Sequence, residues 1–76
     1  MGRMDDEIKA RLLDENDDFR RLSDQHRGCD VRLSELARKA FLSGEEQLEE
    51  RTLKKQKLWL KDQMEVIKVR YTAQHV

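Results

Sequence analysis

The apolar positions of this 76-residue chain follow a heptad spacing in two separate stretches. In the first stretch the steps are 3, 4, 3, 4, 3 and 4 residues, and the positions are Phe19, Leu22, His26, Cys29, Leu33, Leu36 and Ala40. In the second stretch the steps are 4, 3, 4, 3 and 4 residues, and the positions are Leu53, Lys57, Leu60, Met64, Ile67 and Tyr71. Alternating steps of three and four place each set on one side of an α-helix, as in the seam of a coiled coil. Two such seams joined by a short connection predict an all-α fold built as an antiparallel two-helix hairpin.

Local signals predict the second of three helices over residues 17–40. Asn16 is a good N-cap residue, and Asp17 and Asp18 would lie in the first turn, where the helix dipole favours negative charge. The alternative is one continuous helix that passes through Asn16. Gly28 lies inside this segment and costs about 1 kcal/mol of helix stability relative to alanine.

The third helix is predicted over residues 44–73. Ser43 and Glu46 have the spacing of a capping box, in which each side chain bonds to the backbone N–H of the other residue. A short first helix is expected over residues 5–14, and it should be ordered only if it packs on the rest of the chain. Whether it packs, exchanges between subunits or stays mobile is not decided by the pattern. We expect residues 1–76 to form one small domain.

The predicted third helix also has apolar residues outside its seam. On a helical wheel centred on Leu60, one group of apolar residues lies about 100–120 degrees away and a second group lies nearly opposite. The five residues are Leu48, Trp59, Val66, Leu58 and Val69. One hairpin partner covers only the seam, so this flank predicts a homo-oligomer interface, with a dimer favoured, or a site for an unidentified protein. The alternative is that the first helix folds back and covers Trp59.

Composition supports a long-helix protein. Charged residues make up 42% of the chain, but the net charge is zero and the apolar residues are periodic, which argues against disorder. Residues 1–50 have a balance of −5 and residues 51–76 of +5, so the two arms should attract each other. The neutral total gives no electrostatic reason to expect a nucleic-acid or membrane partner. The pattern shows no long apolar run or signal peptide, and a single cysteine fits a reducing compartment, so we expect a cytoplasmic protein.

Candidate chemistry is sparse. His26 and Cys29 lie three residues apart on one helical face beside Asp30, but a zinc site needs three or four ligands, and His75 is the only other histidine or cysteine. Both residues also occupy seam positions, so we interpret them as core residues. The alternatives are a metal site shared between chains and a disulfide between the Cys29 residues of two chains. We expect no cofactor and no enzymatic activity, because a helical hairpin offers no enclosed pocket.

Nucleic-acid binding is the alternative function. Basic side chains follow the first turns of the third helix and could contact phosphates, with Trp59 stacking on a base. The candidate contacts are Arg51, Lys54, Lys55 and Lys61. The acidic residues just before this run oppose it, because they would repel a phosphate backbone that follows the same face.

One stretch resembles a known family. Residues 53–62 read Leu-Lys-Lys-Gln-Lys-Leu-Trp-Leu-Lys-Asp and are followed by Met64, which is similar to the C-terminal signature of the small bacterial YdcH-like proteins. Residues 16–19 resemble that family's Asn-Pro-x-Phe stretch, and residues 26–30 resemble its His-x-x-Leu-Asp. Asp17 replaces the usual proline and Cys29 the usual leucine. The resemblance extends over roughly residues 8–71 and implies a helical hairpin that is able to self-associate, in a bacterial cytoplasmic setting. It implies no activity, since the family's function is unknown.

Overall fold

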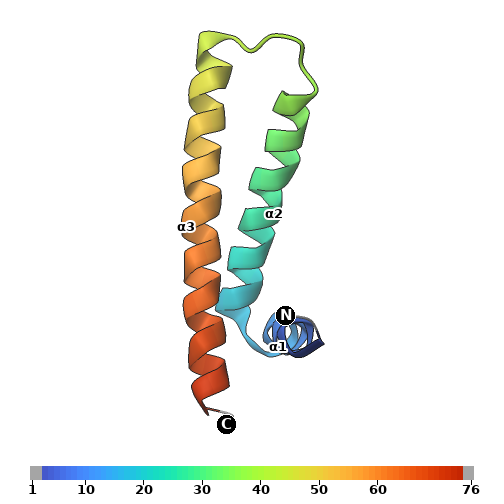
Figure 1. Ribbon diagram of the computed structural model, residues 1–76, viewed down its shortest axis with the longest axis vertical. Helices are drawn as coiled ribbons and strands as arrows, with labels where there is room; N and C mark the ends of the chain where they lie inside the picture. Colours follow the sequence, from blue (N-terminus) through green and yellow to red (C-terminus); the bar gives the residue numbers. More distant parts are fainter. Residues whose placement is uncertain (1–2, 75–76) are drawn as a thin grey trace.

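The chain forms three α-helices in a computed structural model that describes residues 3–74. The helices are α1 (Arg3–Glu15), α2 (Asp17–Ala37) and α3 (Gly44–Gln74). The prediction of an all-α fold is confirmed. Figure 1 shows α2 and α3 side by side, running in opposite directions from a connection at one end, with α1 seen end-on beside the start of α2. The molecule is elongated, with principal extents of 49 × 21 × 19 Å.

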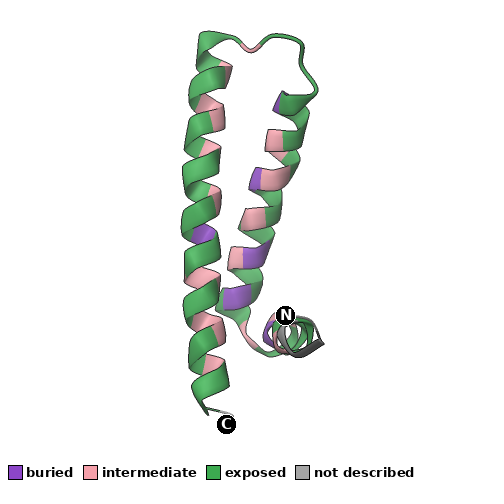
Figure 2. Ribbon diagram, in the orientation of Figure 1, coloured by how far each residue is buried: buried purple, intermediate pink, exposed green. Residues whose placement is uncertain are grey.

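The core is a thin layer between α2 and α3. Phe19, Leu36 and Leu60 are almost fully buried, and Cys29 is 6% exposed. The other seam positions within the helices are half-buried, and they are Leu22, His26, Leu33, Leu53, Lys57, Met64, Ile67 and Tyr71. Figure 2 shows that burial is confined to the facing sides of the helices, while the outer side of α3 is exposed along its length. Each helix therefore buries only a narrow stripe, as the heptad spacing requires.

Helix α1 is packed rather than detached. Leu12 is 2% exposed, which makes it one of the most buried side chains of the molecule. The Arg20 side chain of α2 donates hydrogen bonds to the carbonyl oxygens of Leu13 and Asp14, at 2.8 and 2.9 Å. These carbonyls lie at the C-terminal end of α1, where helical partners are missing. Burial of Leu12 and this cap together stabilise a short helix that would be marginal alone.

The break between α1 and α2 occurs at Asn16. Its backbone is extended (φ −116°, ψ 110°), and its side-chain oxygen accepts a hydrogen bond from the Phe19 N–H at 2.9 Å. The N-cap prediction is therefore confirmed, and the alternative of a continuous helix through Asn16 is wrong. The capped break turns the chain so that α1 crosses the start of α2 (Figure 1).

Helix α2 ends at Ala37, three residues before the predicted end at Ala40. Its last turn tightens, with N–H groups of Arg38 and Lys39 bonded three residues back at 3.3 and 3.2 Å. Ala40 lies outside the helix and is exposed, so it does not extend the seam. The reason is geometric, because the chain needs several non-helical residues to cross the roughly 8–10 Å between packed helix axes.

Helix α3 begins with the predicted capping box. The Glu46 N–H donates to the Ser43 hydroxyl at 3.1 Å, and the Ser43 N–H donates to the Glu46 carboxylate at 3.0 Å. Between Arg3 and Gln74, none of the helices has the length and apolar content needed to cross a membrane.

Candidate functional site

The five apolar residues predicted to form an interface all lie exposed on α3. Their exposed fractions are 65% for Leu48, 62% for Leu58, 57% for Trp59, 44% for Val66 and 59% for Val69. The alternative in which α1 covers Trp59 is wrong, because Trp59 is 57% exposed and α1 lies beside the start of α2 (Figure 1). These five apolar side chains are therefore left uncovered by the described part of the chain.

The exposed side of α3 has its own heptad spacing. Steps of 4, 3, 4, 3, 4, 3 and 4 residues connect eight exposed positions, which we call the outer stripe: Leu48, Thr52, Lys55, Trp59, Asp62, Val66, Val69 and Ala73. From Lys55 onward, each position comes two residues after a position of the α3 seam, which is about 200 degrees around the helix. Leu58 borders the outer stripe beside Trp59. The helix thus presents one seam to α2 and a second, nearly opposite, to solvent.

Four members of the outer stripe were missed by the sequence interpretation. Thr52, Lys55, Asp62 and Ala73 complete the spacing, but they are polar or small, and the apolar residues alone did not reveal an unbroken heptad. The signal was available as the repeated steps of three and four starting at Leu48. An open depression of about 400 Å³ lies on this side between Asp62, Val66 and Val69, with Glu65 and Arg70 at its border.

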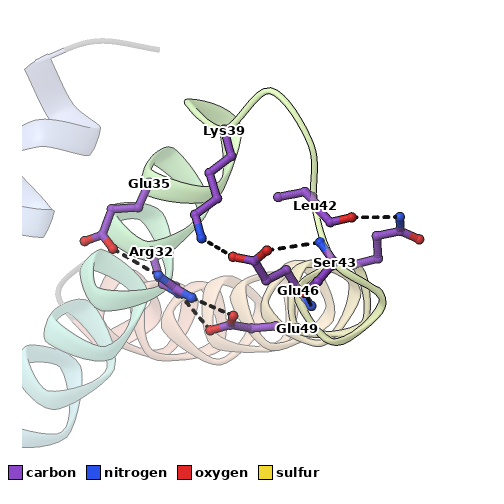
Figure 3. A network of polar contacts seen from close by, with 8 residues as sticks. Arg32, Glu35, Lys39, Leu42, Ser43, Glu46 and Glu49 are labelled. Carbon is purple, nitrogen blue, oxygen red and sulfur yellow. Dashed lines mark hydrogen bonds and ion pairs between the residues drawn. The ribbon is translucent and has the colours of Figure 1, made fainter.

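The opposite side of α3 is joined to α2 by ion pairs. The Arg32 guanidinium donates to both carboxylate oxygens of Glu49, at 2.8 and 2.9 Å, and to Glu35 at 3.2 Å (Figure 3). The Glu49 and Glu35 carboxylates raise the pKa of Arg32, and the Arg32 guanidinium lowers the pKa of Glu49. A bidentate ion pair of this kind fixes the register of two helices better than a single hydrogen bond does.

Two further pairs lie on either side of this one. Lys39 pairs with Glu46 near the connection, and with the Ser43 N–H it lowers the pKa of Glu46 to about 2 (Figure 3). Lys57 pairs with Asp30 near the middle of the helices and lowers the pKa of Asp30. These charges are used within the chain, so they hold the hairpin together and are not available to a partner.

The basic residues proposed as nucleic-acid contacts are all exposed but do not form one surface. Arg51, Lys54, Lys55 and Lys61 are spread over roughly a third of the helix circumference. The Lys54 ammonium lies 3.8 Å from the Glu50 carboxylate. Lys55 lies in the outer stripe, whereas Lys61 lies about 120 degrees away around the helix and lines a groove at the junction of the three helices. A phosphate backbone following one face of α3 would therefore meet only part of the set.

A groove of about 340 Å³ at the junction of the three helices also contains lysines. It is lined by Phe19, Met64, Ser23, His26 and Glu65 and by the lysines Lys9, Lys57, Lys61 and Lys68. Lys57 is paired with Asp30, and the Lys68 ammonium lies 3.6 Å from the Glu65 carboxylate. Two of the four ammonium groups are thus already balanced by carboxylates, which makes the groove a weak anion site.

His26 and Cys29 lie in the seam between α2 and α3. The Cys29 thiol donates to the Gln56 side-chain oxygen at 3.9 Å, and His26 Nδ1 lies 3.7 Å from the Asp30 carboxylate. Over residues 3–74, no three side chains of His, Cys, Asp or Glu are grouped so as to hold a metal ion. His75, the third candidate ligand, lies outside the described residues. The Cys29 thiol faces α3 and is far around the hairpin from the outer stripe, so a dimer formed there would not bring two such thiols together.

Comparison with known proteins gives a family but no activity. A family model described as a protein of unknown function, DUF465, matches residues 19–68, which include most of both long helices. The YdcH-like proteins suggested by the residue 53–62 signature are members of this same family. The chain has no significant match among curated proteins or solved structures. Because the family model covers well over half of the chain, this protein belongs to the DUF465 family of proteins of unknown function.

Proposed function

We propose that this protein is a non-enzymatic self-association module, in which the outer stripe of α3 joins two copies of the chain. The observation behind this proposal is the line of large apolar side chains on α3, each between 44% and 65% exposed. Large apolar side chains that are exposed together along one side of a helix are typical of protein interaction sites, whereas single exposed ones are common on any surface. Burial of such a surface against a second copy removes it from water, which is the main favourable term in protein association.

The antiparallel packing of α2 against α3 supports this function, because it holds α3 in a fixed position. Helix α3 has 31 residues and is thus about 46 Å long. Its inner side is held against α2 by Leu60 and by the Arg32–Glu49 pair. The outer stripe is therefore presented in a fixed geometry, as in a coiled-coil bundle, and little ordering is needed when two copies meet.

Trp59 is the anchor of the proposed interface. It is the only tryptophan of the chain, it lies near the middle of the outer stripe, and it is 57% exposed. Tryptophan is enriched among the residues that contribute most to interface energies, usually near the interface centre. A charge at this position should therefore prevent association while leaving the fold of the single chain intact.

The test is the mass in solution, measured by light scattering over a concentration series. We expect the wild-type protein to be a dimer and Trp59→Glu to be a monomer with unchanged helix content by circular dichroism. Ser34→Glu is the matched control, because it adds the same charge at an exposed position of α2, and it should remain dimeric. A monomeric wild-type protein at all concentrations, or a dimeric Trp59→Glu variant, would refute the proposal.

Nucleic-acid binding is the second hypothesis, and its support is the exposure of the basic residues at the start of α3. The nucleic-acid hypothesis predicts an effect of substitutions at the basic residues. Replacing Lys54, Lys55 and Lys61 together by glutamine would abolish a salt-dependent shift of RNA or DNA in a gel. Lys55 also lies in the outer stripe, so the variant that separates the two functions replaces only Lys54 and Lys61, and it should weaken the shift while leaving the mass of the free protein unchanged.

A further inference from the structure

We infer that the second copy lies antiparallel on the outer stripe, with the two-fold axis beside Leu58 and Trp59. This inference rests on the proposed self-association and specifies its geometry. It starts from the two charged residues of the outer stripe, Lys55 and Asp62. Both are exposed, and neither takes part in an ion pair or hydrogen bond with any residue of the described chain. Their charges are opposite, so a partner that brings them together would satisfy both.

The positions of these charges define a register. In an antiparallel pair of identical helices, residues that face each other have numbers with a constant sum. Lys55 facing Asp62 of the second copy gives a sum of 117 and an axis between Leu58 and Trp59. The same sum pairs Leu48 with Val69 of the second copy at both ends of the interface. One register therefore matches the charges, the central Trp59–Leu58 contacts and the outer apolar contacts.

The neighbouring charges agree with this register. Arg51 and Glu65 border the outer stripe and have a sum of 116, so in this register each lies within one residue, about 1.5 Å along the helix, of the residue of opposite charge on the second copy. Arg51 takes part in no ion pair among residues 3–74, and Glu65 has only its neighbour Lys68, at 3.6 Å. The sequence of charges along the outer side of α3 is thus complementary to its own reverse.

A parallel arrangement lacks these contacts. Each residue of the outer stripe would face its own counterpart, so Lys55 would meet Lys55 and Asp62 would meet Asp62. The opposite charges would be seven residues apart, about 10 Å along the helix, which is beyond ion-pair distance. Like charges at an interface oppose association and select against the wrong orientation. Charge therefore favours the antiparallel dimer over the parallel one.

Charge reversal tests the orientation. In the antiparallel dimer, Lys55→Glu and Asp62→Lys each create two like-charge contacts, and we expect each to weaken dimerisation roughly tenfold or more. The double variant restores both attractive pairs, so its dissociation constant should return to within about threefold of the wild-type value. In a parallel dimer, each single variant only exchanges one like-charge contact for another and has little effect. Sedimentation equilibrium measures all four constants, and circular dichroism checks that each variant is folded.

Cysteine cross-linking gives an independent test that leaves the charges unchanged. On a Cys29→Ser background, Leu58→Cys places a thiol beside the axis, where it meets its own counterpart and should form a disulfide-linked dimer under mild oxidation. Val69→Cys is the matched control, because its counterpart would be about 31 Å away along the helix and should not cross-link. A parallel dimer would link both variants.

The outcomes separate this inference from the proposed function. A wild-type dimer that is dissociated by Trp59→Glu, but unaffected by either charge reversal, would support self-association and overturn the antiparallel register. Failure of the double variant to recover, or cross-linking through position 69, would also overturn it. A wild-type protein that is monomeric throughout would refute the proposed function itself, and this inference with it.

Discussion

Gly28 is the one glycine inside a long helix whose replacement should strengthen the fold. It lies in the middle of α2, and a Cβ atom added there would meet no other atom within 4 Å. Alanine therefore adds no clash, while it lowers the entropy of the unfolded chain and raises helix propensity. We expect Gly28→Ala to raise the free energy of unfolding by about 0.5–1 kcal/mol. Urea denaturation measures the change, and an unchanged or lower midpoint would show that the glycine has another role.

Single residues also show which contacts can be predicted from the sequence and which cannot. Asn16 and Ser43 were recognised as helix caps because each bonds to backbone three residues away, a distance that is readable along the chain. Arg32 was missed, because its partner Glu49 is 17 residues away and becomes a neighbour only when α2 and α3 pack. Leu12 was likewise recognised only as part of a short helix, since its burial depends on the turn at Asn16 and the Arg20 contacts.

The pairing of α2 with α3 depends on pH through three carboxylates. Lys39 lowers the pKa of Glu46 to about 2, and Arg32 and Lys57 lower the pKa values of Glu49 and Asp30. In the unfolded chain these groups bind protons near pH 4–4.5, so between that range and about pH 2 the unfolded state binds more protons. The stabilisation by these pairs is therefore complete above about pH 5 and is lost as the pH falls toward 2.

Thermal unfolding between pH 7 and pH 2 tests this expectation. The Tm of the wild-type protein should fall through the acidic range, and Glu46→Gln should reduce the fall. Glu45→Gln is the matched control, since Glu45 is exposed in the same first turn of α3 and forms no ion pair with a described residue. Equal effects of the two substitutions would show that the Lys39–Glu46 pair does not contribute to the acid sensitivity.

At the scale of the elements, helix starts were easier to predict than helix ends. The starts of α2 and α3 are determined by local caps, and both were predicted at the observed residues. The end of α2 is determined by the distance that the chain must cross to reach α3, and the heptad pattern contains no information about that crossing. For this reason Ala40 fitted the spacing of the seam but lies in the connection.

For the whole molecule, self-association should be visible in thermal stability. When two folded chains bind each other and unfolded chains do not, the Tm rises with protein concentration by mass action. We therefore expect the wild-type Tm to increase over a hundredfold range of concentration, while the Tm of Trp59→Glu stays constant. Differential scanning fluorimetry or calorimetry provides this measurement. A wild-type Tm that is independent of concentration would argue against a dimer coupled to folding.

Only some residues of the candidate interface could be predicted from the sequence. Its apolar members were identified because the seam could not account for Leu48, Trp59 and Val66. Lys55 was assigned instead to a basic patch, and Asp62 was assigned no role, because charges inside an apolar line look like interruptions when one helix is considered alone. Their complementarity becomes evident only when the helix is placed against its own reverse.

Because Cys29 is buried between α2 and α3, the rate at which its thiol is labelled reports how often the two helices separate. The thiol lies between α2 and α3, 6% exposed, with its proton directed at Gln56. A thiol reagent can reach it only when the two helices separate, so the rate of labelling counts separation events rather than surface encounters. The chain has no other cysteine to obscure this signal. Comparing labelling rates in dilute and concentrated protein would therefore test whether the proposed association of two copies slows the separation of α2 from α3 in each one.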